Sequence, residues 1–174
     1  MQSTRSVIFE DCRVPAENLL SDEGMGFKLA MAGLDGGRLN IGACSLGGAQ
    51  RCLDEAIAYT KERAQFGQPI AEFQNTQFML ADMATDLEAA RALLYVAAAK
   101  VTAGAPDKSR FSAMAKRLAT DSGSKIVNDA LQLFGGYGYL KDYPIERFWR
   151  DLRVHSILEG TNQVMRIIVG RDLL

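Results

Sequence analysis

Apolar residues recur three and four positions apart over most of the chain, a pattern typical of helices that bury one face. A short helix is expected from about Gly24 to Leu34, where the sequence Asp35-Gly36-Gly37 interrupts the pattern. A long helix follows, and the positions along its seam are Leu39, Gly42, Leu46, Ala49, Leu53 and Ala56. Large and small residues alternate on this seam, so a neighbouring helix can approach it closely.

Two further long helices show the same period. The first follows the loop at Phe66-Gly67-Gln68-Pro69, and its seam consists of Leu80, Met83, Leu87, Ala90, Leu94, Ala97 and Val101. Gly104-Ala105-Pro106 ends it, and Asp107 or Ser109 can cap the next helix. The seam of that helix consists of Phe111, Met114, Leu118, Ile126, Ala130 and Leu133.

Two shorter helices are expected to close the chain, one around Ile145–Val154 and one from about Thr161. Three long antiparallel helices joined by short loops are typical of an up-and-down bundle. The pattern therefore predicts an all-α helical bundle domain over residues 21–174.

The first twenty residues show a different pattern. Ser6–Glu10 has strand character, and Val14-Pro15 breaks it. One strand without a partner cannot form a sheet, so the arm either pairs with something beyond this chain or lies loosely on the helices. We interpret residues 1–20 as the remnant of a preceding β domain, with its last strand in residues 6–14.

Composition and charge narrow the class of protein. The chain has 174 residues, 48% of them apolar and 24% charged, which suits one domain with a real hydrophobic core. Its 20 basic and 21 acidic residues give a net charge of -1, so nothing favours nucleic acid or an anionic membrane as a partner. No apolar run approaches the roughly 18 residues that span a bilayer. Cys12, Cys44 and Cys52 show no regular spacing, which indicates reduced cysteines and an intracellular compartment.

Most catalytic arrangements find no support in the residue types present. His155 is the only histidine, so a histidine-rich metal site is excluded and a Ser-His-Asp triad is disfavoured. Beside Arg153, this histidine is interpreted as structural. The glycines of Gly135-Gly136-Tyr137-Gly138 can be a helix stop with a tight turn, or a place where a ligand approaches the backbone.

The segment around Glu159 carries the best candidate for chemistry. Its carboxylate is set among apolar neighbours and is followed by Gly160, after which Thr161 or Asn162 can cap the terminal helix. One interpretation is a carboxylate at a helix start, stabilised by the helix dipole. The other is a partly desolvated carboxylate that serves as a base. Periodicity does not choose between them.

Four motifs in order resemble the signatures of the acyl-CoA dehydrogenase family. They are Arg63-Ala64-Gln65-Phe66-Gly67, then Gln74, then Gln132–Tyr139, and then Leu158-Glu159-Gly160-Thr161. Order and spacing match from Phe9 onward. The segments most similar to the isobutyryl-CoA, or short and branched-chain, branch are Gly33–Arg38, Tyr139–Tyr143 and Val164–Arg166.

The resemblance implies that an acyl-CoA thioester is oxidised to its 2-enoyl form with FAD as cofactor. Glu159 is then the base for the alpha proton, and its backbone N–H helps to hold the thioester oxygen. A minority of the family carry the base at the position of Gly37, so that location is empty here. Asp35, Arg38 and Gly160 match substrate-contacting positions, whereas the plainer interpretation makes Asp35 a helix cap and Arg38 half of a solvent ion pair.

The resemblance also implies two groups of FAD contacts. Arg63 and Phe66 match residues that meet the cofactor of a neighbouring subunit, where a guanidinium suits a pyrophosphate. Thr161 and Gln163 match contacts with the cofactor of the chain's own site. The remaining positions that match cofactor contacts are Gln65, Gln74, Gln132, Leu133, Phe134, Gly135 and Gly136.

Partners and location follow from the same resemblance. It implies an acyl-CoA substrate, an electron acceptor such as an electron-transfer flavoprotein, and a homodimer or homotetramer. The expected location is the cytoplasm, or the mitochondrial matrix in a eukaryote. The family carries a helical domain and a β domain before this region, so this chain alone is expected to have little activity and an apolar surface where those domains pack. The alternative is a non-catalytic helical oligomerisation module.

Overall fold

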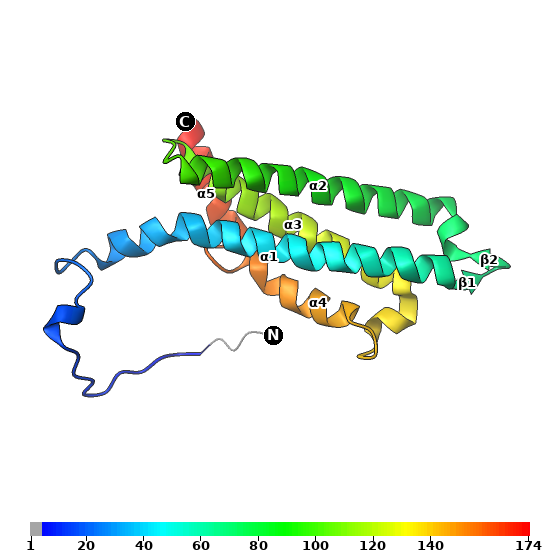
Figure 1. The fold of residues 1–174 in the computed structure, drawn as a ribbon, viewed down its shortest axis with the longest axis horizontal. Coiled ribbons are helices and arrows are strands. Elements are labelled where there is room, and N and C mark those ends of the chain that lie inside the picture. Colours follow the sequence, from blue (N-terminus) through cyan, green and yellow to red (C-terminus); the bar gives the residue numbers. More distant parts are fainter. Residues whose placement is uncertain (1–4) are drawn as a thin grey trace.

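The computed structural model describes residues 5–174, and its main feature is three long helices packed side by side (Figure 1). They are α1 (Gly26–Glu62), α2 (Gln74–Thr102) and α3 (Lys108–Phe134). Two shorter helices, α4 (Ile145–Leu152) and α5 (Asn162–Leu173), pack against α3 at its two ends. The prediction of an all-α up-and-down bundle is confirmed.

Short elements connect the helices. β1 (Ala64–Gln65) and β2 (Gln68–Pro69) form a small antiparallel hairpin at the tip between α1 and α2. The left-handed backbone of Phe66 and Gly67, with φ of 53° and 85°, makes its turn. The 3-10 segments of the described chain are η1 (Ala16–Asn18), η2 (Ile70–Glu72), η3 (Gly135–Tyr139) and η4 (Arg153–Ser156).

The expected break at Asp35-Gly36-Gly37 is wrong, because α1 runs through it without interruption. Glycine in a helix interior costs only about 1 kcal/mol relative to alanine, which tertiary packing can offset. Asp35 does not cap a helix either. Its carboxylate accepts hydrogen bonds from Arg38, one turn further along α1, and from Ser109 of α3. The polar group that suggested a helix start is satisfied inside the helix.

The predicted seams of α1 and α2 form the core. Leu46, Ala49, Leu53 and Ala56 of α1 are buried, as are five members of the α2 seam: Met83, Leu87, Ala90, Leu94 and Ala97. A Cβ added to Gly42 would lie 3.0 Å from Cδ1 of Leu94. The close approach that the small residues predicted is confirmed.

Only two of the six residues predicted for the seam of α3 are fully buried. Ile126 and Ala130 are fully buried, but Phe111, Met114 and Leu118 are only partly so. The residues that α3 buries most deeply in its first half are small or polar: Ser112, Ala113, Ala115, Lys116, Ala119 and Thr120. α3 packs against α1, α2, α4 and α5, so it is enclosed on several sides. Helices approach closely through small residues, so side-chain size is a poor guide to the buried face of such a central helix.

The expected strand in residues 6–14 does not form within the described chain. Residues 5–14 have no regular structure, and the arm runs away from the bundle before it returns to α1 (Figure 1). Val7, Ile8 and Phe9 are exposed. A strand needs a partner for its backbone groups, and no segment within residues 5–174 pairs with this one. Residues 1–4 of the predicted 1–20 segment lie outside the described residues.

Two further observations concern the described residues. Within residues 5–174, no helix has both the length and the apolar character needed to cross a membrane. Cys12, Cys44 and Cys52 are free thiols, and burial raises the pKa of the Cys52 thiol to about 12. A thiol so seldom ionised is a poor nucleophile, so Cys52 is a packing residue.

Candidate active site

The segment that carries Glu159 is a left-handed turn just before α5. Glu159 has φ of 54° and Gly160 has φ of 88°. Thr161 caps α5, because its hydroxyl oxygen accepts a hydrogen bond from the Val164 N–H at 3.3 Å. Non-glycine residues seldom adopt this conformation, so contacts elsewhere must hold Glu159 in it.

The Glu159 side chain rests on α1. A Cβ added to Gly37 would lie only 2.9 Å from Cδ of Glu159. The bare backbone of Gly37 therefore provides the space in which the carboxylate sits. The carboxylate thus contacts α1 and also lies just before α5, so both the base and the helix-start charge stay predictions for Glu159.

Asp35 and Arg38 lie next to this turn and are both buried, with 9% and 7% of their surface exposed. Nη1 of Arg38 donates to Oδ1 of Asp35 at 3.0 Å, and the Ser109 hydroxyl donates to the other carboxylate oxygen at 2.6 Å. Nε of Arg38 points at the Glu159 carbonyl oxygen over a longer 3.4 Å. The plainer interpretation of a solvent ion pair is therefore wrong. The three residues that the resemblance assigned to the substrate therefore lie together, because Gly160 follows Glu159, Arg38 bonds the Glu159 carbonyl and Asp35 pairs with Arg38.

Sequence reasoning missed Lys116. This residue of α3 is fully buried, and its ammonium donates to the Gly160 carbonyl oxygen at 2.9 Å and to Oδ1 of Asn162 at 2.8 Å. Burial lowers the pKa of Lys116 to about 8. A signal was present in the sequence, because Lys116 shares one helix face with Ser112, Ala119 and Gly123. A lysine on a face of small residues is out of place unless its charge has partners.

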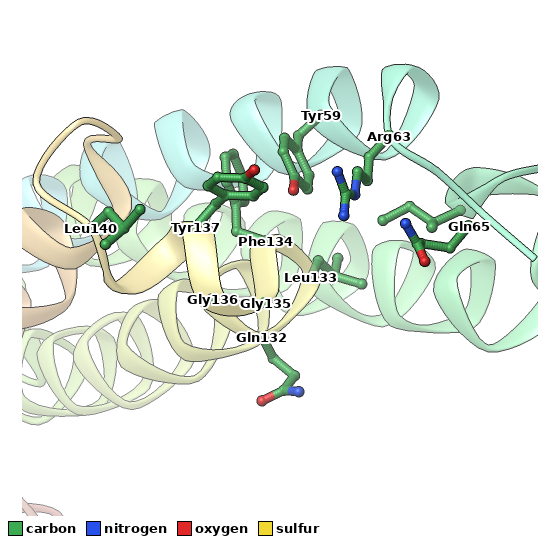
Figure 2. Close-up of a pocket in the computed structure, with 11 residues that line it drawn as sticks. Tyr59, Arg63, Gln65, Gln132, Leu133, Phe134, Gly135, Gly136, Tyr137 and Leu140 are labelled. Carbon is green, nitrogen blue, oxygen red and sulfur yellow. The ribbon is translucent and has the colours of Figure 1, made fainter.

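A second group of candidate residues lies near the far end of α1. Gly37 and Arg63 are 26 positions apart, which along a helix is about 39 Å. There a cavity of about 400 Å³ opens beside the end of α3 (Figure 2). Seven of the residues expected to contact FAD line it, and they are Arg63, Gln65, Gln132, Leu133, Phe134, Gly135 and Gly136.

Aromatic rings form the floor of this cavity. Figure 2 shows the rings of Tyr59, Phe134 and Tyr137 close together, with the Arg63 guanidinium beside them. The Tyr59 and Phe134 rings stack with centroids 4.1 Å apart, and the Arg63 guanidinium lies 5.6 Å from the Tyr137 ring centroid. The cavity therefore combines an aromatic wall with a cation that lies over one of its rings.

The glycine turn at this end is a helix stop that leaves open space. α3 ends at Phe134, and Gly135 has φ of 58°. A Cβ at Gly135 or Gly136 would meet no atom within 4 Å, so the backbone there is bare toward solvent. The two interpretations of the glycines are compatible, because the same residues end the helix and leave its end accessible.

The remaining candidates are placed differently. Phe66 is 92% exposed at the hairpin tip, and Gln74 is the first residue of α2; neither lines the 400 Å³ cavity. Thr161 and Gln163 instead line a separate polar hollow of about 230 Å³ beside the Glu159 turn. The structure thus sorts the expected cofactor contacts into two places, one at each end of the bundle.

His155 is a buried structural residue, in agreement with the prediction. Its Nδ1 lies 2.8 Å from the Ser45 hydroxyl oxygen. Burial lowers the pKa of His155, so the neutral ring is favoured.

The glycine turn also yields a stability prediction. A Cβ at Gly138 would lie 2.7 Å from the Leu131 carbonyl oxygen, which is backbone and cannot move aside. We expect Gly138→Ala to lower the free energy of unfolding by about 1–3 kcal/mol, the usual cost of overpacking. Gly136→Ala is the matched control, because its Cβ meets nothing. Thermal unfolding measures both, and equal melting temperatures for the two variants would contradict the prediction.

Comparisons with known proteins agree with this geometry. Residues 24–174 match the family described as acyl-CoA dehydrogenase, C-terminal domain. The chain is 58% identical to the mitochondrial isobutyryl-CoA dehydrogenase of Dictyostelium discoideum over 99% of this chain and 41% of that protein. Butyryl-CoA dehydrogenase from Megasphaera elsdenii matches in structure with a TM-score of 0.91 and 47% identity, over 95% of this chain and 43% of the other.

A third match comes from a structure described as the electron transferring flavoprotein of Acidaminococcus fermentans. One of its chains matches with a TM-score of 0.92 and 54% identity, over 96% of this chain and 44% of that one. The chain therefore spans about two fifths of the length of the relatives it matches.

Proposed function

Because the chain belongs to the acyl-CoA dehydrogenase family and corresponds to its C-terminal domain, we propose that it forms part of an enzyme that oxidises a short or branched acyl-CoA to the 2-enoyl-CoA. One observation carries the proposal: the Glu159 carboxylate sits on the bare backbone of Gly37, on a turn whose carbonyls face two buried cations. A carboxylate held at a defined place on a rigid helix suits a general base.

The residues of this chain have separate tasks in the proposed reaction. The Glu159 carboxylate takes the alpha proton of the thioester, and its backbone N–H donates to the thioester oxygen, which makes that proton more acidic. As the α C–H bond breaks, its electron pair forms the new double bond and a hydride leaves the β carbon. FAD, when bound, supplies the acceptor for that hydride. Asp35, Arg38 and Gly160 position the substrate beside Glu159.

The residues present fit FAD at two places. Arg63 offers paired charge-assisted donors for a pyrophosphate at the cavity edge, and the bare backbone of Gly135 and Gly136 admits a bulky group. We propose that this end, with Gln65, Phe66 and Gln74 nearby in sequence, contacts a cofactor held by a neighbouring subunit. Thr161 and Gln163 would contact the cofactor beside Glu159 in the chain's own site.

Substrate class, partners and location are proposed from the relatives. The identity with an isobutyryl-CoA dehydrogenase supports a short, 2-methyl-branched acyl group. The match to a chain in an electron transferring flavoprotein structure supports such a flavoprotein as electron acceptor. Contacts with a neighbouring subunit's cofactor require a homo-oligomer. The mitochondrial relative supports the mitochondrial matrix, and the bacterial relatives support the cytoplasm.

The direct test uses a full-length dehydrogenase that carries this domain. Mixing the FAD-loaded protein with isobutyryl-CoA without oxygen should bleach the flavin absorbance, and butyryl-CoA is the unbranched comparison. Bleaching by isobutyryl-CoA supports the proposal. No bleaching by either thioester, in a protein that holds FAD, would contradict it.

The 174-residue chain alone should turn over isobutyryl-CoA at less than about 1% of the full-length rate. Without the preceding domains, water reaches the Glu159 side of the site and the substrate is not aligned, and alignment supplies much of a rate enhancement. A reductase-coupled assay with added FAD measures this, and robust turnover would contradict it.

The alternative function, a helical oligomerisation module without catalysis, has one observation in its favour. Large apolar side chains are exposed on the first turns of α1 and just before it, where Leu20 is 90% and Phe27 is 77% exposed. Such a surface suits contact with another protein segment. A colourless protein that is tetrameric by light scattering would favour this alternative, whereas a yellow protein with flavin absorbance favours the enzyme.

A further inference from the structure

The ammonium of Lys116 is buried, yet no carboxylate among the described residues pairs with it. Within residues 5–174, its hydrogen-bond partners are the Gly160 carbonyl oxygen and Oδ1 of Asn162, and it forms no ion pair. Asn162 is buried too, and its amide donates to the Thr120 hydroxyl at 2.9 Å and to Asp121 at 2.7 Å. Lys116 thus ends a chain of hydrogen bonds that ties α3 to the Glu159 turn.

Fold stability does not explain this charge. Burying an ammonium without a carboxylate is unfavourable, and an apolar side chain of similar volume often replaces a buried ion at no loss of stability. Burial lowers the pKa of Lys116 from 10.5 to about 8. Below about pH 8 the side chain is charged in both the folded and the unfolded state, so the full cost of burying the charge lowers the free energy of unfolding. As the pH rises toward 10.5, the folded protein holds the neutral amine and that penalty is relieved.

Charged and titratable groups face Lys116 from α3, α1, η4 and the Glu159 turn. Asp121 on its own helix and Glu159 on the turn favour the ammonium, whereas Arg38 on α1 disfavours it. His155 of η4 also lies near enough for Lys116 to lower its pKa. Lys116 is therefore placed within electrostatic reach of the carboxylate that we propose as the base.

Lys116 bonds the carbonyl of Gly160, the residue that follows Glu159 in the turn. Glu159 and Gly160 both adopt left-handed backbone, which strains a glutamate. Arg38 faces the Glu159 carbonyl at 3.4 Å, whereas Lys116 binds the Gly160 carbonyl at 2.9 Å. Both bonds have a charged donor, and the shorter one, from Lys116, is the stronger of the two restraints. Losing it would let the turn relax and carry the carboxylate away from Gly37.

We propose that Lys116 is a positioning residue for Glu159: its ammonium holds the Gly160 carbonyl, and thereby keeps the base carboxylate seated against Gly37. This inference rests on the proposed function of Glu159. A group that acts through the turn affects the rate of proton abstraction more than the binding of the acyl-CoA.

Lys116→Met separates positioning from folding, because methionine fills the same space without charge or donor. In a full-length dehydrogenase that carries this domain, we expect the melting temperature to stay equal or rise. The limiting rate of flavin reduction should fall about 100-fold, with KM changed less than about threefold. Lys125→Met is the matched control on the same helix, because Lys125 is exposed and its ion-pair partners in the described part of the chain are Asp86 and Asp129.

A second readout needs neither cofactor nor substrate. In Lys116→Met, the backbone amides of residues 160–164 should exchange with deuterium about tenfold faster than in the wild type, while amides in the middle of α2 keep their protection. Lys125→Met should leave both regions unchanged. Lys116→Gln, which keeps an N–H donor, should lie between the wild type and the methionine variant in both measurements.

The outcomes are distinguishable. A stable, slow Lys116→Met with a loosened turn supports the proposal, whereas a stable variant within about threefold of the wild-type rate overturns it. If neither Lys116 variant folds while Lys125→Met does, Lys116 serves the fold alone and the proposal is also overturned. Glu159→Gln in the same assay separates the two claims. If it stays active, the proposed function fails; if it is inactive while Lys116→Met is fast, only this inference fails.

Discussion

Glu159→Gln is expected to lower the rate of flavin reduction by an acyl-CoA by about 10³-fold, within the range of about 10²–10⁴ that a general base contributes. The amide has the shape of the carboxylate and fits the same space against Gly37, but it cannot accept the alpha proton. Thioester binding should survive, because the backbone N–H of residue 159 is kept. Anaerobic stopped-flow of a full-length dehydrogenase that carries this domain measures the rate.

The control for this variant is Glu88→Gln. Glu88 is an exposed glutamate of α2 that pairs with Arg91 of the same helix, so the same chemical change occurs far from the turn. Its reduction rate should match the wild type. Both variants should keep the wild-type melting temperature within a few degrees, because an exposed ion pair contributes little. A Glu159→Gln enzyme that reduces its flavin at the wild-type rate would exclude Glu159 as the base.

Gly37→Ala is expected to slow flavin reduction by about 100-fold, the cost of misplacing a catalytic group by roughly 1 Å. The new Cβ would lie 2.9 Å from Cδ of Glu159, so the carboxylate must leave its place on α1. The obstructing group is the end of a flexible side chain, and therefore the fold should tolerate the change. Alanine also favours the helix over glycine by about 0.5–1 kcal/mol, so the melting temperature should not fall.

Gly36→Ala is the matched control for this prediction. Gly36 is the preceding residue of the same helix, and a Cβ there would meet no atom within 4 Å. The variant should keep the wild-type rate and melt at an equal or higher temperature. Both variants change helix propensity in the same way, so a difference between their rates reports only where the new Cβ lies. Equal rates for the two alanine variants would show that the space above Gly37 does not position Glu159.

The fold shows where local pattern is a sufficient guide. The seams of α1 and α2 were predicted correctly because each helix buries one face, so period and size carry the information. The break expected at Asp35-Gly36-Gly37 was wrong because the Asp35 carboxylate is satisfied by tertiary contacts, which local pattern does not reveal. Its partners, Arg38 and Ser109, satisfy the carboxylate inside the helix, and Ser109 belongs to a helix 74 positions away.

The candidate site also contains residues that sequence motifs predicted and residues that only the packing revealed. Glu159, Asp35, Arg38 and seven of the residues that line the cavity were named from sequence motifs, because a motif preserves residue types in order, whereas Tyr59 of the same cavity lies in no motif and was missed. Lys116 was not predicted as a site residue. Its interaction is a hydrogen bond to the Gly160 carbonyl, 44 positions away, and no sequence motif links the two residues. The buried face of α3 was misjudged likewise, because enclosure by four helices is decided by their packing.

The sequence by itself determined the helical bundle, the family and the residue types at its candidate site, because periodicity and motif order are properties of the chain alone. Only the tertiary structure decided that Gly37 provides the space for Glu159, that two buried cations face the turn, and that the expected cofactor contacts form two groups at opposite ends of the bundle. The physical reason is that packing and hydrogen bonds depend on distances between atoms remote in sequence, which arise when the helices pack.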